Sequence, residues 1–246
     1  PKIASILAEI GEPHRIIVCN DGSDDKTQSM LEKYSLEMPI EILTHKLNRG
    51  LGESMRDLFE RANEIIQSGD IIIRLDCDDT HDPIYIPSII EKIREGFDVV
   101  VASRFLENGG QTGVEGYRAF ISRGATLFMR LFFPISGLKE YTCGFRGYRA
   151  DKIREAIEFY GNDFVQLKGL GFTCTLEKLV KLNMLGATFG EVPFVLKYNQ
   201  KLSSSKMVSS ITALGYITMA ILYHWPFGGW RRGYSKKIED MRASIE

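Results

Sequence analysis

Short apolar, mostly β-branched runs alternate with amphipathic helical stretches along the first part of the chain, and this alternation constrains the fold more than any other feature. The runs predict strands at 15–19, 40–44, 71–75 and 98–102. Helical spacing of apolar residues predicts helices at 2–10, 26–34, 53–68 and 87–95. Strands that alternate with helices on short connections form parallel sheets covered on both faces. The sequence therefore predicts an α/β fold with a mostly parallel sheet flanked by helices.

Length and composition bound the class of protein. With 246 residues, the chain can bury a sizeable core in one large domain with an appendage. A formal net charge of −1 gives no overall field that would attract nucleic acid, so no nucleic-acid partner is expected. The four cysteines lack metal-ligand spacing, which is typical of free thiols in a reducing compartment. No secretory signal opens the sequence, and the domain is expected to face the cytosol.

Two carboxylates spaced one residue apart, Asp76 and Asp78, follow the short apolar run 71–75. Alternate residues at a fraying strand end can both reach a point just beyond the sheet edge. Mg²⁺ is typically held by one or two protein carboxylates and completed by water and substrate phosphates. The pair therefore indicates a site for a divalent metal and a diphosphate. The alternative is a polar turn after a buried strand.

Polar clusters follow every one of these predicted strands, at 20–25, 48–52, 76–83 and 103–104. In parallel α/β sheets, ligands bind outside the carboxyl ends of the strands. Because the clusters coincide at those ends, they favour one ligand site at this edge of the sheet.

Short polar and glycine-containing motifs follow one another along the chain, at Asn20–Thr27, Asp76–Pro83, Ser103–Phe105, Gly109–Gly110, Ser122–Ala125 and Gly144–Arg149. In order and spacing, between about residue 3 and about residue 210, they resemble family 2 glycosyltransferases. The dolichol-phosphate mannose synthase group and its bacterial polyprenyl-phosphate sugar transferase relatives are the most similar. The resemblance implies a GT-A (Rossmann-like) fold, a UDP- or GDP-linked sugar donor, Mg²⁺ or Mn²⁺, and an inverting transfer. It also implies an opening strand with a Tyr-Asn-Glu-like segment before Pro1.

The resemblance places the donor against the turn after 15–19 and the loop after 40–44. Asp21 would accept a hydrogen bond from the base, and Gly22 would allow close backbone approach. The alternative for Asp21 is a helix N-cap, and the two roles can coexist. Relatives usually have two acids here, and the first is replaced by Asn20. The candidate donor-binding residues are Asn20, Asp21, Gly22, Ser23, Asn48, Gly50 and Asp76.

Within the acidic motif, the resemblance assigns Asp76 to the donor side and Asp78 to the cation. Relatives have a glutamine ligand two positions further on, where this chain has Thr80, a weaker ligand. The candidate metal ligands are Asp78, Asp76 and Thr80. His81 is interpreted as a structural loop residue, with a general base as the alternative.

Two arginines and a serine make the candidate acceptor site. Arg118 and Ser122 are four residues apart in a helical stretch and so share one face, and Arg104 ends the preceding strand. Guanidinium groups and a hydroxyl suit a phosphate, and relatives use matching positions for the acceptor lipid phosphate. The alternative is that the arginines are solvated surface charges. Candidates for supporting roles are Arg123, Arg146 and Arg149.

The type of acceptor decides whether a general base is needed. A phosphate oxygen is already ionised near pH 7 and needs only positioning and charge neutralisation, whereas a sugar hydroxyl needs a base. In-line attack of a phosphate oxygen on the anomeric carbon is therefore the expected reaction. Glu177 and Asp79 are reserve carboxylates if a base is required, although a surface-helix role is preferred for Glu177. The candidate catalytic residues are Asp76, Asp78, Arg104, Arg118 and Ser122.

Two segments have the character of membrane-interface helices. The stretch 119–133 is basic and rich in aromatic residues, and 207–225 lacks formal charge but is two-sided, which favours lying on a membrane over crossing it. Trp225, Trp230 and a basic cluster follow, as expected of interfacial anchors. The alternative for both helices is ordinary core packing.

A loop at 199–206 departs from the pattern of the relatives, which carry an acidic residue, an arginine and a glycine before Ser-Lys. Ser205 and Lys206 match, but Gln200 replaces the arginine unless Lys201 substitutes for it. A pyrophosphate clamp from this loop is therefore not expected to be complete.

These features predict a GT-A catalytic domain over 1–206, without its first strand, and a membrane-associating helix with a basic tail over 207–246. The expected function is inverting transfer of a sugar from a nucleotide-sugar to a polyprenyl or dolichyl phosphate at the cytosolic membrane face. One alternative is a family 2 transferase that acts on a saccharide hydroxyl. Another is an inactive module that binds nucleotide-sugars or membranes, suggested by Thr80, Gln200 and the missing first strand.

Overall fold

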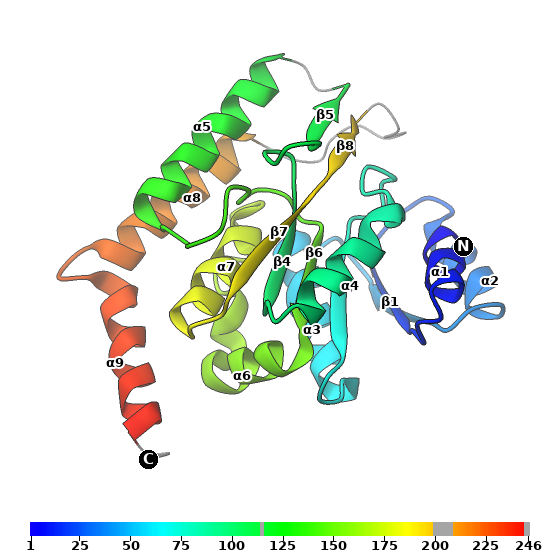
Figure 1. Cartoon of the computed structure of the whole chain (residues 1–246), viewed down its shortest axis with the longest axis horizontal. Helices are drawn as coiled ribbons and strands as arrows, with labels where there is room; N and C mark the ends of the chain where they lie inside the picture. Colours follow the sequence, from blue (N-terminus) through cyan, green and yellow to red (C-terminus); the bar gives the residue numbers. More distant parts are fainter. Residues whose placement is uncertain (114–115, 199–208, 244–246) are drawn as a thin grey trace.

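The computed structural model describes residues 1–113, 116–198 and 209–243, with side chains described throughout except at 116–121 and 209. Its strands are β1 (Ile16–Asp21), β2 (Ile40–His45), β3 (Ile71–Arg74), β4 (Val99–Ser103), β5 (Gly110–Thr112), β6 (Arg146–Arg149), β7 (Phe189–Pro193) and β8 (Val195–Lys197). Its helices are α1 (Lys2–Glu9), α2 (Thr27–Ser35), α3 (Leu51–Ile65), α4 (Ile86–Arg94), α5 (Gly116–Phe132), α6 (Ala150–Tyr160), α7 (Thr173–Met184), α8 (Ser209–His224) and α9 (Gly229–Ala243), with 3₁₀ helices η1 (Pro83–Tyr85) and η2 (Gly161–Val165) (Figure 1). The elements expected from the alternation are confirmed, with ends shifted by a few residues.

Within the described residues, hydrogen bonding groups the strands into three sheets: β1–β2, β3–β6–β4–β7 and β5–β8. The pairs β1–β2, β4–β7 and β5–β8 are parallel, while β6 runs antiparallel to both β3 and β4. The α/β class and the parallel elements are confirmed, but the larger sheet is mixed because β6 enters it. The expected strand before Pro1 stays a prediction.

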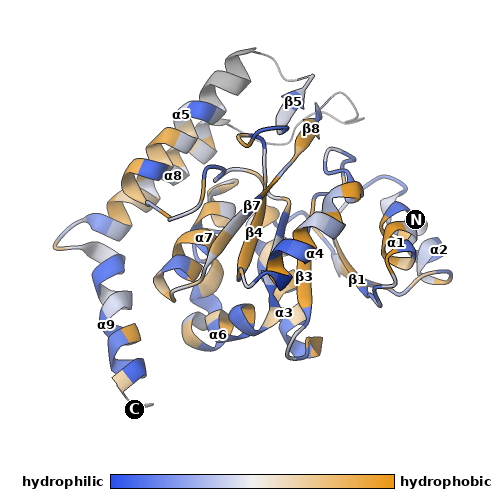
Figure 2. Ribbon diagram, in the orientation of Figure 1, coloured by the Kyte–Doolittle hydropathy of each residue, from blue (hydrophilic) through white to orange (hydrophobic). Residues whose placement is uncertain are grey.

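The core forms where β4 lies between other strands and under α4. Val99, Val100 and Val101 are fully buried, and Ile86 and Ile89 of α4 are almost completely buried. Hydrophobic residues mark these strands in Figure 2. A run of β-branched residues buried on both faces is typical of a central strand, and burying each such side chain contributes about 1.5–3 kcal/mol.

Helix α3 joins the β1–β2 pair to the four-stranded sheet through side-chain packing. It contacts β1 on one side and α6, α7 and η2 on the other. Its Phe59 packs edge-on against Tyr148 of β6 at 5.5 Å and Phe164 of η2 at 5.8 Å between ring centroids. Helix α3 therefore helps to set the position of the β1–β2 pair relative to the rest of the core.

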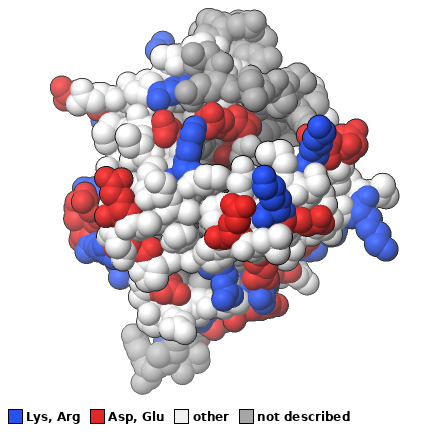
Figure 3. All heavy atoms as spheres, turned by 90° about the vertical axis from the view of Figure 1, so that its right-hand side faces the viewer, with Lys and Arg blue, Asp and Glu red and all other residues white. Residues whose placement is uncertain are grey.

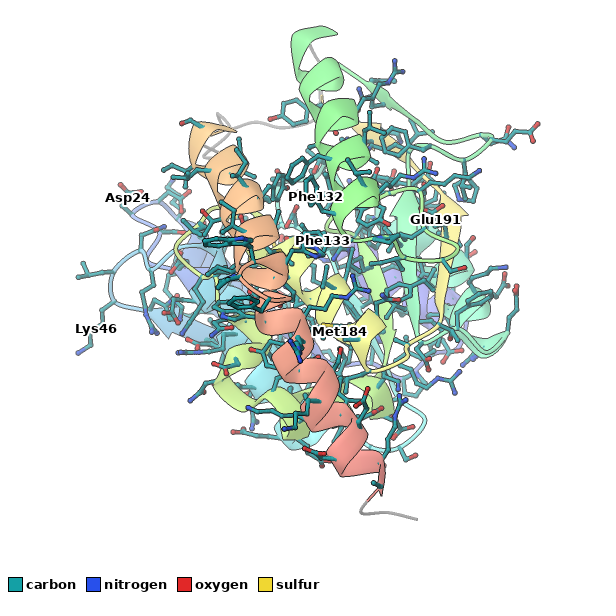
Figure 4. All side chains as sticks on the ribbon, turned by 90° about the vertical axis from the view of Figure 1, so that its left-hand side faces the viewer. Asp24, Lys46, Phe132, Phe133, Met184 and Glu191 are labelled. Atoms are coloured by element: carbon teal, nitrogen blue, oxygen red, sulfur yellow. The ribbon has the colours of Figure 1, made fainter. Side chains whose placement is uncertain are left out.

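The C-terminal helices pack on the core as well as facing outward. Met219 and Tyr223 of α8 are fully buried, and Tyr223 meets Phe133 at 5.6 Å between ring centroids. Figure 4 shows Phe132 and Phe133 between α5 and α8, and His224 Nε2 lies 2.9 Å from the carbonyl oxygen of Phe132. The stretch 209–224 thus contributes part of the hydrophobic core.

The outward sides of α5, α8 and the turn after α8 carry a row of exposed apolar side chains, called here the apolar face. Basic residues on α5 and α9, including Arg123, Arg130, Arg231 and Arg232, are exposed near these helices. No described helix combines the length and the hydropathy that crossing a bilayer requires. The apolar face consists of Leu127, Leu131, Ile211, Leu214, Ile217, Ile221, Trp225 and Phe227.

Candidate active site

The turn after β1 and the loop after β2 are bound together around the carboxylate of Asp21. Its Oδ1 accepts the N–H of Arg49 at 2.8 Å, and its Oδ2 accepts the N–H of Gly50 at 2.8 Å. Asn48 donates to the carbonyl oxygen of Asp21 at 3.1 Å. Gly22 has a φ of 67°, and a Cβ there would lie 2.6 Å from the backbone nitrogen of Asn48. The structure thus brings together most of the residues expected to bind the donor.

Asn20, one of the expected donor residues, is bonded to its own turn and to the helix that follows. Asn20 is 4% exposed, accepts the N–H of Ser23 at 3.1 Å and donates to Gln28 at 2.8 Å. Asp21 does not cap the following helix, because Asp25 accepts the N–H of Thr27 at 2.9 Å instead. The N-cap alternative for Asp21 is therefore wrong, and Asn20 shapes the turn rather than presenting its amide to a ligand.

His45, which the sequence did not single out, lies between two carboxylates. Its Nδ1 is 2.7 Å from Asp21 Oδ1 and its Nε2 is 2.8 Å from Asp57 Oδ2. The hydrogen bond to Asp21 is the main cause that raises the pKa of His45, partly opposed by burial and helped by Asp57. Burial raises the pKa of Asp21, but the N–H of Arg49 and the ring of His45 outweigh it and lower the pKa. The register could have located His45, because Asp21 and His45 are partners at the ends of β1 and β2.

This arrangement predicts a stability contribution that depends on pH. Because the folded pKa of His45 lies above 6.5, its protonation stabilises the fold fully below that value, and the contribution is lost as pH rises through the folded pKa. The pKa values of Asp21 and Asp57 are lowered, so both stay ionised in this range. We expect the destabilisation by His45→Gln, measured by denaturant unfolding, to shrink between about pH 6 and about pH 9.

His14→Gln serves as the control, because the ring of His14 meets a backbone carbonyl, Glu12 O at 3.3 Å, rather than a carboxylate. A His45→Gln penalty that stays constant across the range would contradict the prediction.

The acidic motif after β3 forms a compact loop. Thr80 is 4% exposed and donates to Asp78 Oδ1 twice, from its Oγ1 at 2.5 Å and from its N–H at 3.2 Å. Thr80 therefore orients Asp78 in this structure, whereas the sequence interpretation made it a third metal ligand. Cys77, between the two acids, is exposed.

The donor atoms of this loop fit a hard divalent cation. Asp76 and Asp78 supply carboxylate oxygens, the ligand type that Mg²⁺ and Mn²⁺ prefer. The described part of the chain contains no cluster of three or more His, Cys, Asp or Glu residues placed to hold a metal. Two carboxylates are sufficient where substrate phosphates and water complete the coordination.

His81 supports the loop from inside. It is 5% exposed, and its Nδ1 accepts the N–H of Asp76 at 2.9 Å. A backbone N–H can only donate, so Nδ1 carries no proton. Burial is the main cause that lowers the pKa of His81 to about 4. These contacts favour the structural interpretation of His81 over the general base.

On the acceptor side, Arg104 follows β4 and reaches Ser122 of α5, with 3.3 Å between NH2 and Oγ. Arg104 also donates to Gln111 at 3.2 Å and to Thr142 at 2.6 Å. The structure thus brings Arg104 and Ser122 together as expected. The side chain of Arg118 lies outside the described residues, although its backbone belongs to α5.

Arg104 is not a solvated surface charge, because Glu140 pairs with it inside the protein. The Arg104 Nε–Glu140 Oε2 distance is 2.7 Å and the NH2–Oε1 distance is 3.0 Å, while Glu140 is fully buried. Backbone N–H groups of Thr142 and Cys143 donate to the same carboxylate. Burial raises the pKa of Glu140, but Arg104 outweighs it and holds the pKa below its usual value. No sequence pattern indicates Glu140, which lies in a loop without periodicity.

A second carboxylate, Glu191 of β7, binds the backbone of the loop that carries Glu140. It accepts the N–H groups of Lys139 at 2.9 Å and Glu140 at 2.6 Å, and burial raises its pKa. Figure 4 shows Glu191 on the β7 side of α5.

The arginines expected to support the acceptor site are placed elsewhere. Arg146 is fully buried and donates to the carbonyl oxygens of Cys143 and Thr175, so it serves the backbone. Arg149 is paired with Ile71 at the start of β3, at the opposite edge of the sheet from the acidic motif. Arg123 is exposed on α5. The supporting roles of Arg146 and Arg149 were therefore wrong.

The reserve carboxylates are also engaged. Glu177 is fully buried, pairs with Lys181 at 2.6 Å and accepts the N–H of Leu167 at 2.9 Å, so the surface-helix interpretation was wrong and a base role is unsupported. Asp79 pairs with Lys2 at 3.0 Å. The loop residues Gln200, Lys201, Ser205 and Lys206 lie outside the described residues.

The chain is similar to a known protein family and to several curated proteins. A family model described as glycosyl transferase family 2 matches residues 2–156. A dolichol-phosphate mannosyltransferase of Pyrococcus furiosus is 30% identical over 172 residues, which cover 70% of the chain and 45% of that protein. The chain thus spans less than half of that relative. An undecaprenyl-phosphate mannosyltransferase of Micrococcus luteus is 27% identical over 231 residues, which cover 94% of the chain and 86% of that protein. A dolichyl-phosphate hexose transferase of Haloferax volcanii is 28% identical over 210 residues, covering 83% and 80%.

Solved structures confirm the fold. A glucosyl-3-phosphoglycerate synthase from Mycobacterium tuberculosis, in complex with Mn²⁺ and UDP-glucose, has a TM-score of 0.53 and 15% identity, covering 90% of this chain and 73% of that one. The complex of the same protein with phosphoglyceric acid has a TM-score of 0.53 and 14% identity, covering 89% and 74%. The expected GT-A-like fold is therefore confirmed.

Proposed function

The chain belongs to glycosyl transferase family 2, and from that premise we propose that it transfers a sugar from a nucleotide-sugar donor to a polyprenyl or dolichyl phosphate. The relatives named above carry mannosyl or hexosyl transfer to such lipid phosphates in their names, which supports this acceptor class.

The proposal rests on the placement of two strand ends, one followed by acidic residues and the other by an arginine. β3 and β4 both pair with β6 and run parallel to each other, so their carboxyl ends lie at the same edge, about 10 Å apart at twice the interstrand spacing. The acidic motif with Asp76 and Asp78 follows β3, and the Arg104–Ser122 pair follows β4. A metal-bound diphosphate and an incoming phosphate can therefore be held side by side.

The proposed reaction does not require a general base from the protein, because the attacking phosphate oxygen is already ionised. A phosphate oxygen attacks the anomeric carbon in line, so one displacement inverts the configuration there. Arg104, which is paired with Glu140, and Ser122 position the attacking phosphate by hydrogen bonds, and Asp76 and Asp78 face the departing diphosphate. A divalent cation bound by Asp78 and Asp76 would supply the charge that stabilises this leaving group.

We further propose that the apolar face lies on the cytosolic surface of a membrane. Leu131 on α5 is 75% exposed, and Ile217 and Ile221 on α8 are 51% and 53% exposed. Exposed apolar side chains flanked by arginines suit an interface with anionic lipid. The opposite side of the molecule, which carries α1 and α2, has interspersed acidic and basic side chains (Figure 3).

The test uses the full chain with vesicles of anionic phospholipid that contain polyprenyl phosphate, a panel of UDP- and GDP-sugars, and Mg²⁺ or Mn²⁺. We expect one donor to give a lipid-linked sugar of the corresponding mass, with an inverted anomeric configuration. Transfer to a saccharide hydroxyl without transfer to lipid phosphate would favour the first alternative. No turnover with any donor would favour the inactive binding module.

The same vesicles test the membrane proposal by co-sedimentation. Leu131→Asp with Ile217→Asp is expected to release the protein from the vesicles. Leu36→Asp is the matched control, because Leu36 is 87% exposed after α2, outside the apolar face. Equal sedimentation of all variants would contradict the membrane contact.

A further inference from the structure

Arg74, the last residue of β3, is tied to the first acid of the metal motif. Residues two apart on a strand share a face, so Arg74 and Asp76 extend to the same side. The Arg74 side chain is 9% exposed, and its NH2 lies 2.5 Å from Asp76 Oδ1. A buried guanidinium thus holds a carboxylate that is 31% exposed.

The room for this guanidinium comes from Gly144, in the loop that leads into β6. A Cβ at Gly144 would lie 1.5 Å from Arg74 NH1 and 2.7 Å from its Cζ. No ordinary contact is that short, so any side chain at 144 would displace the guanidinium. The loop itself is fixed, because Arg146 opposite Arg74 donates to the carbonyl oxygens of Tyr141 and Cys143.

The next residue of the loop supports Asp76 by a second route. Phe145 is fully buried and stacks on His81, with 5.4 Å between ring centroids and 23° between planes. His81 in turn accepts the N–H of Asp76. Gly144 therefore leaves room for Arg74, which binds the side chain of Asp76. Phe145 packs against His81, which binds the backbone of Asp76.

We propose that Arg74 is a positioning residue for the donor, acting through Asp76, and that Gly144 is glycine because the Arg74 guanidinium occupies the space of a side chain. This inference rests on the proposed function, in which Asp76 faces the nucleotide-sugar. The Arg74–Asp76 bond fixes one carboxylate oxygen and so fixes the direction in which the other meets the donor. A charge-assisted hydrogen bond of this kind is stronger than a neutral one and more sensitive to geometry.

The test measures equilibrium binding of UDP and of GDP in the presence of Mn²⁺ to the full chain, so it does not depend on turnover. We expect Arg74→Met to weaken nucleotide binding by about 10- to 100-fold, and Arg74→Lys, which retains the charge without the planar fork, to weaken it less. In turnover, the KM for the donor should rise while the KM for the lipid phosphate stays unchanged. Arg149→Lys is the matched control, since Arg149 pairs with Asp98 at the opposite edge of the sheet.

A second measurement tests the space at Gly144. Gly144→Ala should lower the thermal unfolding temperature strongly in the wild-type background and only slightly in an Arg74→Ala background, because the clash is gone. Equal effects in both backgrounds would overturn the role of Gly144. Nucleotide affinities equal to wild type in Arg74→Met and Arg74→Lys would overturn the positioning role while leaving the proposed function intact. A wild-type chain that binds neither nucleotide would overturn both.

Discussion

Replacing Asp78 with asparagine is expected to lower sugar transfer by about 1,000-fold, because the change removes the negative charge proposed to bind the cation while keeping the shape of the side chain. Thr80 can still donate to the remaining oxygen, so the loop should keep its conformation. Chelation of divalent ions in the wild type should cause a similar loss. Re-adding Mn²⁺ should restore the wild type but not Asp78→Asn, as measured by lipid-linked product.

Asp240→Asn is the control for this substitution, because Asp240 is exposed on α9 and distant in sequence from the strand ends. Full transfer by the wild type in excess chelator would show that the acids serve only a turn, which is the alternative raised from the sequence.

Glu140→Gln is expected to reduce the free energy of unfolding by about 3–5 kcal/mol, because it leaves the buried Arg104 without its counter-charge. Glu140 is fully buried and the Arg104 side chain is 10% exposed, so water cannot screen the loss. Denaturant unfolding measures the change. Glu155→Gln, which breaks a partly exposed pair with Lys152 at 2.6 Å, should cost less than about 1 kcal/mol.

A double-mutant cycle separates the pair from its surroundings. Adding Arg104→Met to Glu140→Gln removes the stranded charge, so the double variant should be more stable than Glu140→Gln alone. It should still fail in transfer, because in the proposed function Arg104 positions the acceptor phosphate. Additive effects of the two substitutions on stability would mean that the ion pair is not coupled in solution.

Much of the fold could be predicted because hydrophobic periodicity dominates it. Strands β1 to β4 are apolar runs, and the helices between them have regular apolar spacing. β6 escaped notice because its sequence, Arg-Gly-Tyr-Arg, has no apolar run. It is nevertheless buried, since Arg146 satisfies its guanidinium with backbone carbonyls, a solution that only the folded chain provides.

Part of the candidate site could also be predicted from the sequence, and part could not. The acids after β3 and the arginine after β4 could be placed because strand ends follow from strand positions. The partner of that arginine could not be predicted, because Glu140 meets Arg104 across 36 residues from a loop that carries no periodic signal. His45, the last residue of β2, could be placed opposite Asp21 only with the register of β1 against β2.

The β1–β2 pair and the four-stranded sheet share no backbone ladder in the described part of the chain, so the spacing between the Asp21 loop and the Asp76 loop depends on how side chains pack along α3. A change in the volume of the core beside α3 would therefore alter the spacing of the two loops that we propose to bind the nucleotide-sugar. Replacing Phe59 of α3 with a smaller residue would leave the Asp21 loop and the Asp76 loop intact. It would loosen the packing that sets the distance between them, and so weaken the binding of a ligand of fixed length that contacts both loops.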